Sequence, residues 1–181
     1  MAYPQIADVP MADSFNAFKN LIRSHAQRQQ EAPQSFIDWE ARRQWWVSQV
    51  DCLLVRIRAW LGSLVDEKIV GFTQLTTELD EPYLGKYVIH KAQIDCAGRS
   101  MTIVPVASIV LGGFGRIDVS GPAGRVTLIL AAPDNTLPGR HPWEGATWLM
   151  THSQDPSSLT SLDEALFHQI FVDLFEIGDG L

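Results

Sequence analysis

The sequence predicts an α+β fold in which an N-terminal helical hairpin or arm precedes a mostly antiparallel sheet of five to six strands and a C-terminal covering helix. Through the first third of the chain, apolar residues recur at alternating spacings of three and four, as on one face of a long helix. After Pro82 they gather instead in short runs separated by glycine and proline, which is typical of strands and turns. The connections are too short for helical crossovers, so neighbouring strands should be antiparallel.

The helical region is expected over residues 13–81, after a loose N-terminus at residues 1–12. A first helix is expected between residues 13 and 30, and Ser35 should cap a longer second helix. Residues 69–81 are expected to form a further short helix. The long helix carries an apolar stripe that only one arginine interrupts, formed by Phe36, Trp39, Arg43, Trp46, Val50, Leu53, Ile57, Trp60 and Leu64.

The sheet and the closing helix are expected over residues 82–181, within one cooperative domain. Pro105 should lie in an edge strand or at a bend, because proline cannot donate a ladder hydrogen bond. Ser161 and Glu164 form a capping box ahead of a strongly apolar helix, and Gly178 should end that helix. Short strands are predicted at residues 87–89, 101–104, 109–111, 117–119, 126–130 and 147–150.

The net charge of the chain is −7, from 14 basic and 21 acidic side chains, and it is unevenly distributed. Residues 1–64 carry seven basic and six acidic side chains, whereas residues 65–181 carry seven and fifteen. The acidic part repels phosphate backbones, so nucleic acid is not an expected partner. The long helix interleaves acids with its basic side chains, and we expect a solvated helix face rather than a basic patch at Arg42, Arg43, Arg56 and Arg58.

Nothing in the sequence predicts export or membrane insertion. The first residues contain neither a basic region nor an apolar run, so no signal peptide is expected. The apolar runs are far shorter than the ~20 residues that span a bilayer, so no membrane contact is expected. Cys52 and Cys96 lie in no metal-binding or redox motif. We therefore expect a cytoplasmic protein with reduced thiols.

Asp118 is the first candidate catalytic residue. The run Phe114–Val119, the turn after it and the strand at 126–130 resemble the core of metal-dependent nucleases of the restriction-enzyme type. In such a core an aspartate ends one strand and a Glu-x-Lys follows on the next, so that the carboxylates bind magnesium. Here the second strand contains neither a carboxylate nor a lysine. The simpler interpretation is an ion pair between Arg116 and Asp118 on one strand face.

His141 and His152 are the other candidate catalytic residues. They flank a loop that is rich in proline and glycine and lie near Asp134, Glu144 and Asp155. Imidazole and carboxylate groups bind metals and transfer protons, so this is the best metal or acid–base cluster in the sequence. No HxH or HExxH spacing fixes its geometry, and a solvated acidic loop is the simpler interpretation. We assign no metal and no cofactor.

The aromatic side chains of the long helix are the candidate interface residues. They are Phe36, Trp39, Trp46 and Trp60. At heptad spacing within an apolar stripe, such rings belong to a core or to an interface rather than to a stacking platform for a ligand. The stripe is three columns wide, which favours packing in a bundle or on a sheet, with a short coiled-coil dimer as the alternative.

Several segments follow one another in a specific order and spacing: Leu79–Tyr87, Val104–Val106, Gly112–Asp118, Gly121, Trp148 and the capped closing helix. In this order the chain resembles a family of small uncharacterised bacterial proteins, from the long helix to the C-terminus. The resemblance implies no activity and no site residue.

These observations favour a non-enzymatic protein-interaction module, that is, a subunit or regulator that assembles through its helices. The predicted helices have more apolar surface than one sheet of short strands should cover, so a protein partner or self-association is expected. A twofold homodimer is the simplest form, with Trp39 or Trp60 as interface anchors. The alternative is a metal-dependent hydrolase of a degenerate restriction-nuclease type that uses Asp118 with loop carboxylates and histidines.

Overall fold

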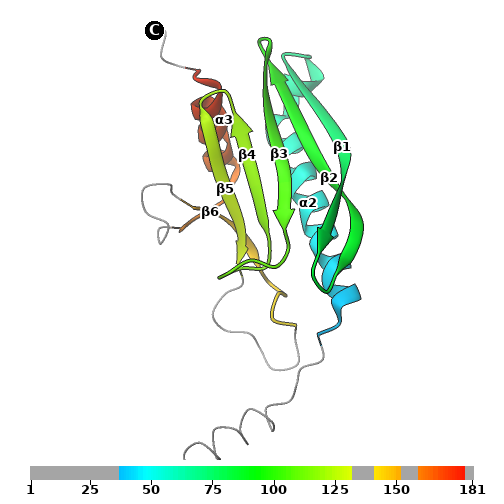
Figure 1. The fold of residues 1–181 in the computed structure, drawn as a ribbon. Coiled ribbons are helices and arrows are strands. Elements are labelled where there is room, and N and C mark those ends of the chain that lie inside the picture. Colours follow the sequence, from blue (N-terminus) through cyan, green and yellow to red (C-terminus); the bar gives the residue numbers. More distant parts are fainter. Residues whose placement is uncertain (1–36, 132–140, 152–158, 178–181) are drawn as a thin grey trace, which may run out of the picture. The chain divides into compact units, whose positions relative to one another are not determined.

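A computed structural model describes residues 37–131, 141–151 and 159–177. The chain divides into two units, Met1–Ile37 and Asp38–Leu181. All the described helices and strands belong to the second unit. The expected loose N-terminus, first helix, Ser35 and Phe36 lie outside the described residues. The second unit has the predicted α+β fold, with two described helices and seven described strands (Figure 1).

The strands form one antiparallel sheet in which every strand pairs with its neighbours in the sequence. The connections after residues 81, 96 and 121 are two or three residues long, and so tight a turn joins antiparallel neighbours. The described sheet has seven strands, so the expected number of five to six was too low. The strands are β1 (Val70–Glu81), β2 (Gly85–Cys96), β3 (Arg99–Ala107), β4 (Arg116–Gly121), β5 (Gly124–Ala131), β6 (Thr147–Thr151) and β7 (Leu159–Ser161).

Two predicted elements in this region were wrong. Residues 70–81 form β1 rather than a helix, and they pair with β2 without interruption from Val70 opposite Cys96 to Glu81 opposite Gly85. The predicted helical region therefore ends at the long helix. Residues 109–111 form no strand, because only an isolated bridge joins Val110 to Gly113.

The long helix is α2 (Trp39–Asp66), and it begins later than predicted. Its N-cap is Asp38, whose carboxylate accepts a hydrogen bond from the backbone N–H of Ala41 at 2.9 Å. Near its C-terminal end the helix is kinked at Gly62, where φ is 40°.

The closing helix is α3 (Glu164–Phe175), and its cap also differs from the prediction. Asp163, not Ser161, is the N-cap and accepts a hydrogen bond from the N–H of Leu166 at 2.8 Å. Ser161 is not available as a cap, because it pairs with Leu149 in the sheet. The helix ends at a left-handed Glu176, and the predicted stop at residue 178 lies outside the described residues.

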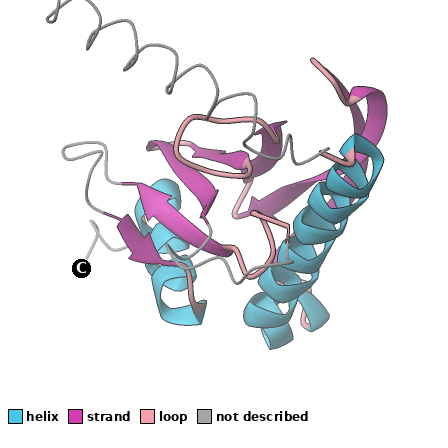
Figure 2. Cartoon of the chain, turned by 90° about the horizontal axis from the view of Figure 1, so that it is seen from below, coloured by secondary structure: helices cyan, strands magenta, loops and turns pink. Residues whose placement is uncertain are grey.

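Both described helices lie on the same face of the sheet (Figure 2). α2 packs against β1 and β2, while α3 packs against β3, β4 and β5. The core lies between the two layers, so the apolar stripes of both helices are covered by the chain's own sheet. The sequence argument for surplus helical surface therefore does not apply to α2 and α3. The largest fully buried side chains are Trp46, Phe167, Leu53, Leu54, Ile57, Ile89, Ile94, Met101, Ile103, Ile117, Leu128 and Leu130.

Pro105 lies in β3, which is placed between β2 and β4. The described pairing of β3 with β2 ends at Ile103, so at Pro105 the strand has only β4 as a described partner. Of the two alternatives, an edge strand or a bend, the bend is confirmed. The register between β3 and β4 shifts between Pro105 and Ala107, as a bulge requires.

Candidate functional site

Asp118 lies in the middle of β4, on the face of the sheet away from the helices. Its neighbours Ile117 and Val119 are buried in the core, and successive side chains of a strand point to opposite faces. The predicted ion pair is confirmed, since Arg116 donates to both carboxylate oxygens, from Nε at 2.8 Å and from Nη2 at 3.0 Å. Arg125 and Thr127 donate at 3.3 and 3.2 Å. The carboxylate is thus surrounded by donors from its own sheet.

The loop candidates are only partly described. His152, Asp134 and Asp155 lie outside the described residues. His141 stacks on Trp143 with 4.5 Å between the ring centroids, and no described hydrogen bond or ion pair joins it to Asp118. Within residues 37–131, 141–151 and 159–177, no group of three or more His, Cys, Asp or Glu side chains is placed to hold a metal ion.

The three described tryptophans of the predicted interface lie in different surroundings. Trp46 has no exposed surface, so it is a core residue of this chain. Trp60 is half-buried against Phe167 of α3, with the ring centroids 5.7 Å apart. Trp39 stacks on the exposed Tyr83 at 4.9 Å. The predicted aromatic stripe therefore forms no continuous interaction surface.

A buried polar cluster that sequence analysis missed lies where the start of α2 meets two loops of the sheet. We call its members, Arg42, Glu81, Tyr87 and Ser108, the Glu81 cluster. One oxygen of Glu81 accepts a hydrogen bond from the Tyr87 hydroxyl. The other accepts bonds from the backbone N–H groups of Ser108 at 2.8 Å and Ile109 at 3.2 Å. Glu81, which is 8% exposed, therefore fixes the loop after β3 to the end of β1.

Arg42 ties α2 to the same loop. The residue is 4% exposed, so its predicted place on a solvated helix face was wrong. Its Nη2 donates to the carbonyl oxygens of Ser108 at 2.7 Å and Phe114 at 2.5 Å. The rings of Trp45 and Trp143 lie 4.8 and 5.4 Å from the guanidinium carbon. Burial lowers the pKa of Arg42 to about 10, although the nearby negative charge of Glu81 acts to raise it. The side chain is therefore charged at neutral pH.

Tyr87 provides a pH test of the Glu81 cluster. Burial raises the pKa of its hydroxyl above the ordinary value of 10, and the hydrogen bond to Glu81 raises it further. The folded protein therefore keeps this proton at a pH where the unfolded chain, with its ordinary pKa, loses it. The resulting stabilisation is complete below pH ~10 and is lost as the pH rises towards the folded pKa.

We expect the free energy of unfolding to fall more steeply above pH ~10 in the wild-type protein than in Tyr87→Phe, which has no group to titrate at this position. Urea unfolding at several pH values between 8 and 11 measures both slopes. Parallel slopes would show that the hydroxyl of Tyr87 is not protected by the fold.

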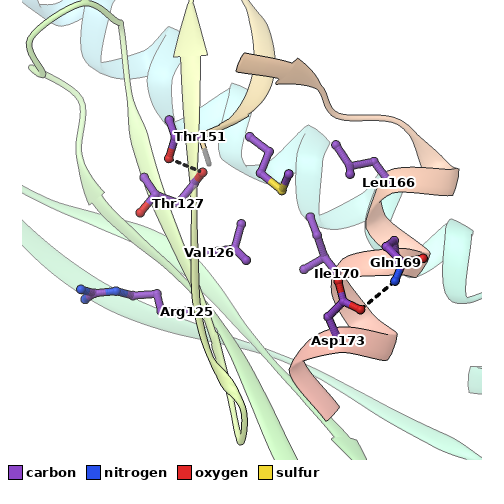
Figure 3. Close-up of a pocket in the computed structure, with 9 residues that line it drawn as sticks. Arg125, Val126, Thr127, Thr151, Leu166, Gln169, Ile170 and Asp173 are labelled. Carbon is purple, nitrogen blue, oxygen red and sulfur yellow. Dashed lines mark hydrogen bonds between the residues drawn. The ribbon is translucent and has the colours of Figure 1, made fainter. Parts of the chain in front are cut away.

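A groove lies between β5, the end of β6 and α3 (Figure 3). It has a volume of about 480 Å³. Its floor is apolar, and its rim carries one cation, one carboxylate and neutral polar groups. The floor is formed by Val126, Met150, Leu166 and Ile170, and the rim by Arg125, Thr127, Thr151, Gln169 and Asp173. Sequence analysis did not identify this groove, because its walls are distant in the chain.

The outer edge of β1 is a second exposed feature. β1 is the first strand of the sheet, and no described strand pairs with its outer edge. It is twelve residues long and contains no lysine, arginine or proline. Leu75, near its middle, is 41% exposed.

Comparisons of the chain with protein families, with curated proteins and with solved structures found no match. In the part of the chain that the structure describes, neither helix has the length and apolar character needed to cross a bilayer.

Proposed function

We propose that the chain is a non-enzymatic protein-interaction module, a subunit or regulator, that pairs with a second copy of itself through the outer edge of β1. The observation that supports this proposal is the unprotected edge of that strand. In an antiparallel sheet, alternate residues of an edge strand point their N–H and C=O groups outward. A twelve-residue strand thus offers a long row of backbone donors and acceptors to another strand.

Soluble proteins normally protect such an edge against pairing. The usual devices are a very short strand, charged side chains or proline on the edge, or a bulge that twists the edge away. Residues 70–77 of β1 have none of these, because the strand is long, this part of it contains no charged residue and no proline, and it pairs with β2 in one continuous register. Its residues 72–77 are uncharged and include three threonines, which suit strands.

The charge distribution along β1 is compatible with antiparallel self-pairing. Its three acidic residues all lie in the C-terminal third of the strand. A twofold axis at Leu75 would place Glu78 opposite Phe72 and Asp80 opposite Val70, so no two carboxylates would face each other. An isologous dimer of this kind is the commonest form of self-association, and it would join the two sheets into one.

Leu75→Lys should abolish this dimer, because the twofold axis would place two lysines directly opposite each other. Leu75 is 41% exposed in the single chain, so a lysine can direct its ammonium group to solvent and the substitution should leave the fold intact. We expect light scattering of the wild-type protein at low micromolar concentration to give twice the chain mass of 20.2 kDa, and the variant to give one chain mass.

Val88→Lys is the matched control. Val88 is an apolar residue that is 60% exposed on the adjacent strand β2, where it pairs with Glu78 of β1 and does not belong to the outer edge of β1. This variant should remain dimeric. A wild-type protein that stays monomeric at 100 µM would refute the proposal, and loss of the dimer in both variants would show that the contact does not depend on the outer edge of β1.

A further inference from the structure

We propose that the groove between β5 and α3 binds an extended peptide that carries one large aliphatic side chain and, two residues away, a lysine or arginine. The groove lies in the half of the sheet that is remote from β1. Its proposed ligand is a peptide, not a second copy of the chain. Three features of the described residues support it: a strand edge without a strand partner, an apolar floor and a carboxylate without an ion pair.

The strand edge beside the groove is free within the described residues. Pairing between β5 and β6 ends where Thr127 lies opposite Thr151, so the first residues of β5 have only β4 as a described partner. The hydroxyl of Thr151 donates to the carbonyl oxygen of Thr127 at 3.3 Å, which shows that this carbonyl points toward β6. Because backbone groups alternate along a strand, the N–H and C=O of Arg125 point to the same side. They can pair with an added strand.

The floor of the groove suits one large aliphatic side chain. Val126 comes from β5, Met150 from β6, and Ile170 and Leu166 from α3. Figure 3 shows Val126, Leu166 and Ile170 gathered around one space. Side chains of an added strand alternate between its two faces, so every second one would enter this space. The volume of about 480 Å³ is sufficient for a leucine or methionine together with its backbone.

The charge at the rim favours a cation. The side chain of Asp173 accepts a hydrogen bond from the neutral amide of Gln169 at 2.7 Å, and no ion pair to it is present among the described residues. The guanidinium of Arg125 is instead directed to Asp118, with 3.3 Å between Nη1 and Oδ2. Asp173 therefore leaves a negative charge at the helix side of the groove. A basic residue two positions from the aliphatic one lies on the same face of the peptide and can reach it.

The test uses the full chain labelled with ¹⁵N and the peptide acetyl-Thr-Lys-Thr-Leu-Thr-Thr-amide. We expect saturable chemical-shift changes at the amides of residues 124–127 and along α3. Replacing the leucine of the peptide by serine, or its lysine by glutamate, should weaken binding at least tenfold.

Asp173→Lys should reverse the charge preference, so that the glutamate peptide binds better than the lysine peptide. The substitution should be tolerated, because a cation in the last turn of a helix interacts favourably with the helix dipole. Asp66→Lys, which makes the same change in net charge at an exposed position of α2, should leave both affinities unchanged. Leu75→Lys should bind the peptide as the wild type does, so this proposal and the self-pairing of β1 can fail separately. Absence of shifts at residues 124–127, or an unchanged preference in Asp173→Lys, would overturn the proposal.

Discussion

Glu81→Ala is expected to lower the free energy of unfolding by about 3–5 kcal/mol, as for other buried charged groups that lose one partner. The carboxylate accepts hydrogen bonds from the Tyr87 hydroxyl and from the N–H groups of Ser108 and Ile109. Alanine removes these acceptors while the donors stay in a buried place, and each unpaired buried donor costs about 1–3 kcal/mol. The charge of the buried Arg42 also loses its nearby opposite charge. Urea unfolding monitored by tryptophan fluorescence measures the loss.

Glu78→Ala is the matched control on the same strand. Its carboxylate is exposed and lies 3.9 Å from the ammonium group of Lys86, a pair that contributes about 0–1 kcal/mol. If the two alanine variants were equally stable, the Glu81 cluster would not hold the fold together.

Trp46→Ala is expected to be insoluble or to lose about 3–5 kcal/mol of stability. The indole ring is fully buried in the core between α2 and the sheet. The backbone closes directly over it, since a Cβ at Gly115 would lie 2.1 Å from the ring atom Cζ3. An alanine at position 46 would therefore leave a large cavity, and a loss of this size is a large part of the stability of a small domain.

Trp46→Phe keeps most of the ring and should cost much less than the alanine variant. Thermal unfolding followed by circular dichroism compares the two. An alanine variant with unchanged melting and altered self-association would instead show that this tryptophan belongs to an interaction surface.

The sequence predicts the fold where one periodic pattern matches one buried face. α2 and α3 were predicted for this reason, because their apolar stripes are the surfaces that the sheet covers. β1 was mistaken for a helix. Phe72, Leu75 and Leu79 are spaced three and four apart, as on one face of a helix, so this spacing does not exclude one. In the structure, Val70, Phe72 and Leu79 all contact the core. Phe72 and Leu79 are seven residues apart, which is an odd number. A flat strand would place them on opposite faces, so the face of β1 that meets the core changes along the strand.

The outer edge of β1 and the groove beside β5 are determined by the order of the strands in the sheet. When residues 70–81 are taken for a helix, the sheet has no edge at this position, and the self-association that the sequence predicts is assigned to the helices instead of a strand. The Glu81 cluster joins residues up to 66 positions apart, and a glutamate before a proline in a turn gives no sign of burial. Arg42 did carry a signal, because it lies four residues before Trp46 and so shares its buried helix face.

Hydrogen exchange along β1 tests the central claim most directly. In a single chain, the amides of alternate residues of β1 point away from β2, where no described strand pairs with them, and should exchange rapidly, while the others are bonded to β2. We predict that both sets of amides are protected in the wild-type protein at 50 µM, and that Leu75→Lys loses protection only in the outward-pointing set. The same alternating pattern in both proteins, with the outward-pointing amides of β1 unprotected, would contradict self-pairing through this edge.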